Sequence, residues 1–283
     1  MGSDPDHIVA QTRIPTGKPA ETLAQVLAFF QQEVASRGPL AAIGIASFGP
    51  LELRQSHPRY GLIRTSPKLG WSNVDIVEPV RRALGVPVEF DTDVNAAALA
   101  EGRWGAARGL DTFVYLTVGT GIGAGAVAEG RIVHGLGHPE MGHLSVPRQP
   151  GDNFAGDCPF HGDCLEGMAS GPAIAARWGR PAEHLGGDML RTAVQLEAAY
   201  LAAGLRNIVY AIAPQRIVIG GSVAGLPGLF PLIRINLAKA LAGYPGLPEH
   251  GADDFIVPAT LGSLAGPAGA LVLADRARQA RPG

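Results

Sequence analysis

Apolar residues follow two different spacings along the chain, and the alternation of the two predicts a mixed α/β fold. Helical spacing runs up to Gly38-Pro39, a pair that stops a helix, whereas short apolar runs bounded by turn residues predict buried strands. Helices are expected at 21–38, at 73–85 with Asn73 as the N-terminal cap, at 95–105, at 188–212, after residue 221 and from about residue 265. Strands are expected at 40–53, 86–90, 112–118, 216–221 and 255–260, with two more around a turn in 122–133.

At 283 residues the chain can bury a sizeable core, and we expect two lobes with a boundary near 105–111. Hydrophobic residues make up 46% and charged residues 17%, as in a compact globular protein, and the net charge of −2 gives no reason to expect a nucleic-acid or membrane partner. No apolar run approaches a membrane span, and the first residues lack a basic stretch followed by an apolar one. We therefore expect a cytoplasmic protein whose thiols stay reduced.

Both cysteines of the chain lie in one short motif, Cys158-x2-His161-x2-Cys164. Thiolate and imidazole are ligands that zinc prefers, and four of them form its tetrahedral structural sites. His143, His138 and His134 are the candidates for a fourth ligand, and His143 is favoured because it directly precedes the run Leu-Ser-Val, which could form a strand end. The alternative is two free cysteines and an unrelated histidine. Four protein ligands would close the site, so the metal is expected to be structural.

A second candidate site lies where the strand at 86–90 gives way to a helix, in the segment Asp91, Asp93 and Asn95. Ligands bind at this edge of α/β sheets, and a carboxylate there could act as a general base toward a hydroxyl. The alternative is that Asp93 or Asn95 only caps the helix, which both residue types do well.

Two glycine-rich turns follow buried strands. The stretch 116–127 superficially resembles a dinucleotide fingerprint, but a strand follows it where that motif requires a helix. Its Gly119-Thr120-Gly121 turn can still offer backbone N–H groups to phosphate oxygens, although a plain hairpin turn is the alternative. Gly220 and Gly221, after another buried strand, would let a flat ligand approach the backbone closely.

Taken together, these segments resemble the ROK family of sugar kinases, within the actin-like ATPase superfamily. The resemblance rests on five motifs in the family's order. Within the family, "TDVNAAALAEG", "TSPKLGW" and the Cys-x2-His-x2-Cys segment are most similar to bacterial fructokinases. The five motifs are "FDTDVNAAALAEGRWGAARG", "YLTVGTGIGAG", "PEMGHLSV", "CPFHGDCLEGMASGPAI" and "RIVIGGSVA".

The resemblance implies an α/β fold of two lobes with a cleft between them, residues 1–109 with 263–283 forming one lobe and residues 110–262 the other. It assigns Asp93 as the catalytic base. Sugar binding is expected from Glu140, His143, Glu166 and Asn95, and ATP binding from Gly119, Thr120, Gly121, Gly220 and Gly221. Zinc is expected on His143, Cys158, His161 and Cys164.

The activity implied is ATP-dependent phosphorylation of D-fructose to D-fructose 6-phosphate, with Mg²⁺ entering with ATP, in a cytoplasmic homodimer. Other hexose substrates, namely glucose, mannose or an N-acetylhexosamine, are the alternatives within the family. The family's opening Asp-x-Gly-Gly-Thr-Lys phosphate loop is absent from this sequence, which begins "MGSDPDHIVAQTRIPTG". A late start of the reading frame or an impaired sugar-binding paralogue is therefore expected, and full activity is expected to need the hairpin that carries this loop.

Overall fold

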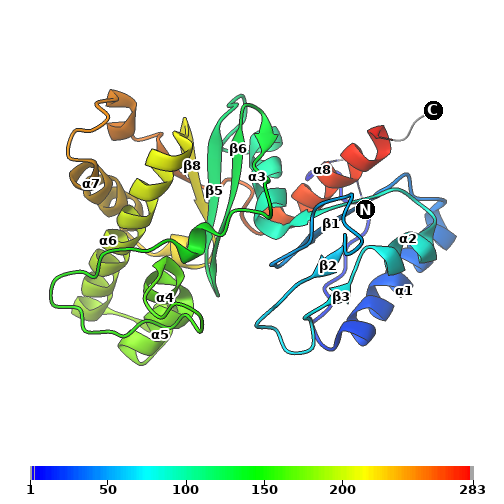
Figure 1. Ribbon diagram of the computed structural model, residues 1–283, viewed down its shortest axis with the longest axis horizontal. Helices are drawn as coiled ribbons and strands as arrows, with labels where there is room; N and C mark the ends of the chain where they lie inside the picture. Colours follow the sequence, from blue (N-terminus) through cyan, green and yellow to red (C-terminus); the bar gives the residue numbers. More distant parts are fainter. Residues whose placement is uncertain (1, 3, 281–283) are drawn as a thin grey trace. The chain divides into compact units, whose positions relative to one another are not determined.

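The computed structural model describes residue 2 and residues 4–280, and its packing divides the chain into two compact units (Figure 1). Unit 1 comprises Met1–Ala100, His134–His138 and Ser263–Gly283, and unit 2 comprises Glu101–Val133 and Pro139–Gly262. The chain thus changes unit inside a helix, and a short segment of unit 1 interrupts unit 2. The domain limits expected from the family resemblance stay a prediction.

Unit 1 is built on two parallel strands, β1 (Ile43–Ser47) and β4 (Val88–Thr92). Their register pairs Ile43 with Val88 and Ser47 with Thr92, so both strands end at the same level. The C-terminal helix α8 (Ala265–Gln279) packs closely along β1 (Figure 1). A side chain at Gly44 would collide with the backbone of Ala270 in this helix, so a glycine in the strand allows the contact.

Two more helices of unit 1 were predicted from the sequence, one with the correct end and one with the wrong start. Helix α1 (Pro19–Arg37) ends at Gly38 as predicted. Helix α2 (Glu78–Leu84) is shorter than predicted, and Asn73 does not cap it. The carboxylate of Asp75 instead accepts the N–H groups of Val77 and Glu78, at 2.9 and 3.0 Å. Asn73 lies in a turn with a positive φ of 61°.

The turn at Asn73 belongs to a small antiparallel pair, β2 (Leu62–Ile63) and β3 (Val74–Asp75), which the sequence analysis missed. Strands of two residues leave no alternating pattern to find. They cover a small apolar core of six buried residues. These are Leu51, Ile63, Trp71, Ile76, Val77 and Phe90.

Unit 2 contains a five-stranded sheet in the order β7-β6-β5-β8-β9. The strand β5 pairs antiparallel with β6 and parallel with β8, so the glycine turn between β5 and β6 closes a hairpin, as predicted. The strands are β5 (Phe113–Val118), β6 (Ile122–Ala128), β7 (Arg131–Ile132), β8 (Arg216–Gly220) and β9 (Ile256–Pro258).

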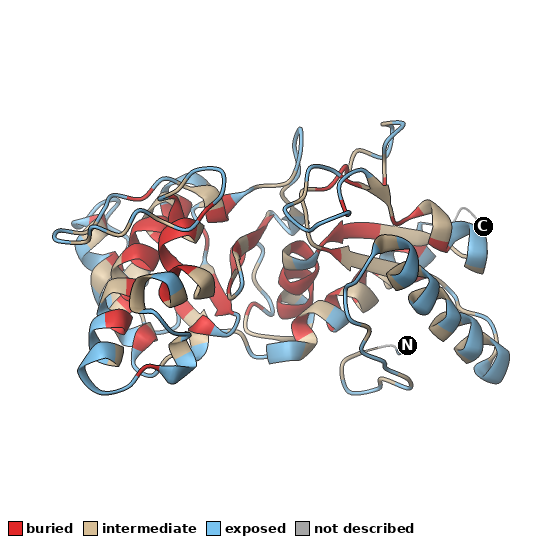
Figure 2. Ribbon diagram, turned by 90° about the horizontal axis from the view of Figure 1, so that it is seen from below, coloured by how far each residue is buried: buried red, intermediate tan, exposed pale blue. Residues whose placement is uncertain are grey.

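Helix α6 (Gly187–Ile212) has a continuous buried face and packs against α7 (Leu229–Leu241). Figure 2 shows the buried residues of the structure in red. The short helices α4 (Leu165–Ala169) and α5 (Gly171–Trp178) follow the cysteine segment. Helix α3 (Asp93–Trp104) contains the change of unit. Within the described residues, no helix combines the length and apolar character that crossing a bilayer requires.

Gly269 in α8 faces the backbone carbonyl of Ala96 in α3 too closely for any side chain. We expect Gly269→Ala to lower the free energy of unfolding by about 1–3 kcal/mol, because the added methyl group overpacks this contact. Gly266→Ala, in the same helix and with open space around it, should be neutral or slightly stabilising. Urea unfolding of the two variants measures the difference, and equal stability would contradict the proposed packing.

Candidate functional site

The carboxylate of Asp93 is the first side chain of helix α3 and lies at the carboxyl end of β4. It does not cap the helix, because the hydroxyl of Thr92 accepts the N–H of Asn95 at 3.1 Å and takes that role. Among the described residues, the carboxylate of Asp93 accepts a hydrogen bond from one other residue, the N–H of the adjacent Val94 at 2.9 Å. The carboxylate therefore remains available to a ligand.

Two opposed effects act on the pKa of Asp93. Burial raises it above the ordinary value, and the backbone hydrogen bonds and the positive charge of Lys68 lower it. Part of the residue is nevertheless open to solvent. An aspartate whose pKa is raised toward 7 by its surroundings is a stronger base than an ordinary aspartate.

Asp91, two residues earlier, is turned into the protein. Its carboxylate accepts the side-chain N–H of Asn95 at 2.7 Å and lies 3.1 Å from the Nε2 atom of His134. This contact raises the pKa of His134, because the carboxylate favours the charged imidazole. Asn95 is fully buried, and its Oδ1 atom has no partner in the described part of the chain. The sugar contact expected of Asn95 stays a prediction.

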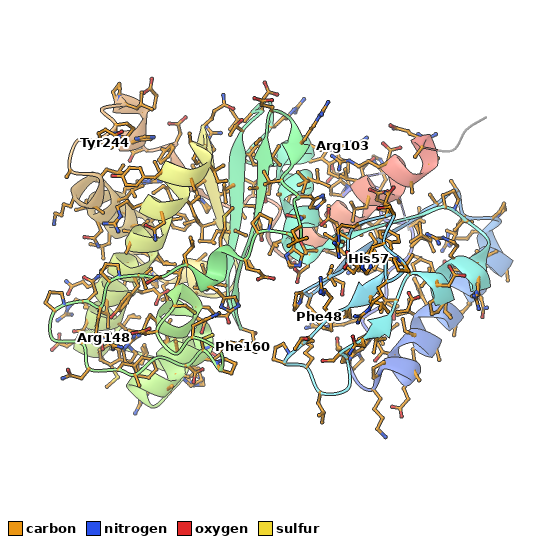
Figure 3. The ribbon with its side chains drawn as sticks, viewed as in Figure 1. Phe48, His57, Arg103, Arg148, Phe160 and Tyr244 are labelled. Carbon is orange, nitrogen blue, oxygen red and sulfur yellow. The ribbon has the colours of Figure 1, made fainter. Side chains whose placement is uncertain are left out.

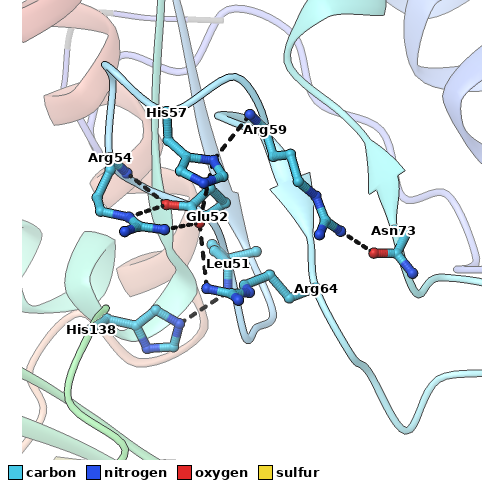
Figure 4. A network of polar contacts seen from close by, with 8 residues as sticks. All are labelled: Leu51, Glu52, Arg54, His57, Arg59, Arg64, Asn73 and His138. Atoms are coloured by element: carbon cyan, nitrogen blue, oxygen red, sulfur yellow. Dashed lines mark hydrogen bonds and ion pairs between the residues drawn. The ribbon is translucent and has the colours of Figure 1, made fainter. Parts of the chain in front are cut away.

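The loop after β1 is held by a buried carboxylate, Glu52, which is 3% exposed (Figure 4). Arg54 donates two hydrogen bonds of 2.7 Å to it, and Arg64 donates a third of 3.3 Å. The bonds from Arg54 lower the pKa of Glu52 to about 2, although burial alone would raise it. At the start of the same loop, the N–H of Leu51 lies 3.1 Å from Nε2 of His138.

The predicted metal ligands come together in unit 2. One nitrogen or sulfur atom of each of the four side chains lies within 4.8 Å of the others. The Nδ1 atom of His143 is 3.8 Å from the sulfur of Cys158 and 3.5 Å from that of Cys164. The Nδ1 atom of His161 is 3.8 Å from the sulfur of Cys158. Two thiols and two imidazoles at these distances can supply the four ligands of a tetrahedral metal site.

His143 reaches the cysteines through a turn and not through the strand that we expected. It ends the 3₁₀ turn Met141–His143, and the next residues are tied to the cysteine segment by a bridge between Ser145 and Cys164. The other two candidate ligands, His134 and His138, lie in unit 1 and contact Asp91 and Leu51. Phe160, labelled in Figure 3, is 60% exposed, and its ring centroid lies 6.2 Å from that of His161.

Two carboxylates flank this cluster in the sequence. Glu166, on α4, accepts the N–H of Ile122 at 2.9 Å through its Oε2 atom. The same oxygen would lie 2.7 Å from a β-carbon at position 121, so the glycine there is required by this contact. Glu140 is exposed and directly precedes the turn that holds His143.

The turn between β5 and β6 opens on a pocket of about 680 Å³ that lies wholly within unit 2. Gly119 and Thr120 line it, whereas Gly121, Gly220 and Gly221 do not. Gly220 lies against the hydroxyl of Tyr115, and Gly221 has a positive φ of 90° directly before the lining residue Ser222. Most of the wall is apolar, and Thr120, Glu183 and Ser222 carry its polar side chains. An apolar pocket with a few polar groups is typical of a small-molecule site.

Other parts of this pocket were missed by sequence reasoning. Gly171 and Pro172, at the start of α5, line it, and the N–H of Gly171 donates to the carbonyl of Gly119 at 2.7 Å. The signal for this helix start was present, because Ser170 is its cap and Pro172 lies in its first turn. The wall segments 181–190 and 222–227 contain short 3₁₀ turns, which leave no periodic pattern.

Comparison with known proteins gives likenesses over nearly the whole chain. The ROK family profile matches residues 3–277. A fructokinase from Zymomonas mobilis is 44% identical over 271 residues, covering 94% of this chain and 89% of that protein. A fructokinase from Pediococcus pentosaceus is 38% identical over 276 residues, covering 98% and 93%. A solved ROK hexokinase from Thermus thermophilus has a TM-score of 0.76 and 31% identity, covering 94% of this chain and 89% of that chain.

The depressed pKa of Glu52 predicts a stability that depends on pH. Because the pKa is lowered from 4.5 to about 2, the stabilisation is complete above pH 4.5 and is lost as the pH falls through about 2. We expect Glu52→Gln to cost about 1–3 kcal/mol at neutral pH, since it leaves Arg54 and Arg64 without their countercharge. The cost should shrink across the window from pH 4.5 to 2, as measured by urea unfolding. Glu249→Gln is the exposed control, and an equal cost at every pH would contradict the ion-pair role.

Proposed function

Because the chain belongs to the ROK family, whose sugar kinases have the actin-like two-lobe α/β fold, we propose that it transfers the γ-phosphoryl group of ATP to a hexose. We propose D-fructose as the hexose, since relatives 38–44% identical over nearly the whole chain are fructokinases. The observation that carries the proposal is the carboxylate of Asp93, which lies at a strand end. It does not cap helix α3, because the hydroxyl of Thr92 does so.

In the proposed reaction Asp93 accepts the proton of the sugar's 6-hydroxyl. That oxygen forms a bond to the γ-phosphorus of ATP, the bond between this phosphorus and the β,γ-bridging oxygen breaks, and ADP leaves. Mg²⁺ would arrive with the nucleotide and neutralise phosphate charge. The chemistry asks the protein mainly for positioned charge and a proton acceptor. The raised pKa of Asp93 suits it to the second task.

Sugar hydroxyls are proposed to bind Glu140, His143 and Glu166. The exposed position of Glu140 supports this for one carboxylate. The Oε2 atom of Glu166 accepts the N–H of Ile122, and its Oε1 atom could accept a hydrogen bond from a sugar hydroxyl. Such charge-assisted hydrogen bonds are among the stronger polar contacts that a sugar can make.

The nucleotide is proposed to occupy the pocket lined by Gly119 and Thr120. The pocket volume of about 680 Å³ and its apolar wall suit a purine ring, and the glycine turn offers N–H groups to phosphate oxygens. Gly121, Gly220 and Gly221 are proposed to contribute by shaping the two turns and not by lining the pocket. The positive φ of Gly221 supports that role.

His143, Cys158, His161 and Cys164 are proposed to hold one structural Zn²⁺. The residues fit the ion, since two sulfur and two nitrogen donors converge and fill its usual four positions. When bound, the ion would fix the cysteine segment and the turn at His143, and thereby the flanking residues Glu140 and Glu166. It is given no part in the transfer itself.

Removal of the metal ligands tests this assignment. Metal analysis of the purified chain should find about one zinc per molecule. Cys158→Ser and Cys164→Ser should each lose the metal and lower the melting temperature, because folding and metal binding are coupled. His184→Ala, an exposed histidine outside the cluster, is the control and should keep the metal. A double cysteine variant with full zinc occupancy would contradict the ligand set.

Asp93→Asn tests the function itself. We expect turnover of ATP with fructose to fall by about 10²–10⁴, because the amide cannot accept the proton. The fold should survive because Thr92 caps the helix, so the melting temperature should be close to that of the native protein. Asp111→Asn, an exposed aspartate in unit 2, is the control.

Two other results would speak against the proposal. Near-native turnover by Asp93→Asn would remove Asp93 as the base. Equal or faster turnover of glucose, mannose or N-acetylmannosamine would replace fructose as the substrate, and no turnover of any hexose would contradict kinase activity of this chain.

A further inference from the structure

Lys68 lies on the face of an aromatic ring at the carboxyl end of β1. Its Nζ atom is 4.2 Å from the ring centroid of Phe48. Phe48, labelled in Figure 3, directly follows the strand. The register pairs the last residue of β1, Ser47, with Thr92, which directly precedes Asp93. The ring and the carboxylate thus occupy neighbouring strand ends within unit 1.

The loop that carries Lys68 is held by several polar contacts. The hydroxyl of Ser72 accepts the N–H of Ser66 at 3.0 Å, and the N–H of Lys68 donates to the hydroxyl of Ser66 at 3.2 Å. Trp71 donates its backbone N–H to the carbonyl of Lys68 at 3.1 Å. The ring of Trp71 packs edge-on against Phe48, with centroids 5.5 Å apart. The ammonium of Lys68 therefore lies on the ring of Phe48, which itself packs against Trp71.

The charge of Lys68 is not neutralised by a neighbour. Among the described residues, no carboxylate oxygen lies within 4.0 Å of the Nζ atom of Lys68, the limit for an ion pair. Its field nevertheless reaches Asp93, where it favours the anionic carboxylate. By contrast, Arg54 and Arg64, also in unit 1, both pair with Glu52. Within the described part of the chain, Lys68 is thus a cation near the proposed base that forms no ion pair with a carboxylate.

We propose that Lys68 binds the phosphoryl group that is transferred to the sugar, and afterwards the phosphate of the hexose 6-phosphate product. The inference rests on the proposed function, since it takes Asp93 to mark the accepting hydroxyl. A compact ammonium on a flexible stem is suited to a phosphate whose position changes during transfer. The cation would also act on the base. When phosphate pairs with the ammonium, less positive charge acts on Asp93, and its affinity for the hydroxyl proton rises.

Chemical labelling can test the inference without turnover, because the chain has only three lysines: Lys18, Lys68 and Lys239. The full chain is acetylated with an amine-reactive ester, and each lysine is followed by mass spectrometry. D-fructose 6-phosphate should slow acetylation of Lys68 by about tenfold, a change that one charge-assisted contact can supply. Lys18 and Lys239 serve as internal controls and should be unaffected. Protection of Lys68 by fructose as strong as that by the phosphate, or no protection at all, would overturn the proposal.

Kinetics of Lys68→Met, which removes the charge and keeps an unbranched flexible side chain, give the second test. Inhibition by fructose 6-phosphate should weaken by about tenfold or more, and kcat/KM should fall. The acid limb of the kcat/KM profile should move to higher pH, because Lys68 favours the anionic form of Asp93. Lys68→Arg should restore part of each effect, whereas Lys239→Met should match the native protein. An unchanged profile and unchanged product inhibition in Lys68→Met would overturn the proposal.

The two proposals fail in different ways. A native chain that phosphorylates no hexose contradicts the proposed function, and the labelling experiment still decides whether Lys68 binds a sugar phosphate. A native chain that is active while Lys68 is neither protected nor needed for product inhibition contradicts the role of Lys68 alone.

Discussion

The hydrogen bond from the N–H of Asn95 to the hydroxyl of Thr92 determines what the surrounding carboxylates can do. It starts helix α3 without using an aspartate. Asp93 is left with a single N–H from its neighbour, whereas Asp91 is turned inward to Asn95 and His134. Two carboxylates two residues apart thus have different environments, since Asp91 is buried and Asp93 is exposed. The parallel register of β1 and β4 then fixes which side chains share that strand end.

Two histidines hold the segment His134–His138 within unit 1. His134 contacts the carboxylate of Asp91, and His138 lies within hydrogen-bond distance of the N–H of Leu51. The residues that follow directly are Pro139, Glu140 and the 3₁₀ turn that carries His143. One stretch of about ten residues therefore contacts the buried carboxylate beside Asp93 in unit 1 and supplies a candidate metal ligand in unit 2.

Sequence reasoning succeeded where the signal was local and chemical. The family, the mixed α/β fold and most long helices and strands are confirmed, because each rests on a periodic pattern or a motif. The convergence of the cysteine and histidine ligands was predictable for the same reason. Asn73 was wrong as a cap because a hidden two-residue strand lies between it and helix α2, and such strands have no period.

The parts that sequence reasoning missed depend on contacts between distant residues. Nothing in the residue pattern indicates that Lys68 lies over Phe48 or that His134 meets Asp91, since strand register and loop closure bring these pairs together. The choice between a cap and a free carboxylate at Asp93 was likewise open until the hydroxyl of Thr92 was seen to occupy the helix end.

Ile122 lies between two close contacts that constrain the evolution of unit 2. The N–H of Ile122 donates to the Oε2 atom of Glu166, and that oxygen leaves no room for a side chain at Gly121. The carbonyl oxygen of Ile122 likewise leaves no room for a side chain at Gly142. A change at any one of these positions is obstructed while the others stay as they are. A descendant that altered the carboxylate would have to acquire compensating changes nearby, so these sites are expected to drift together across lineages and not one at a time.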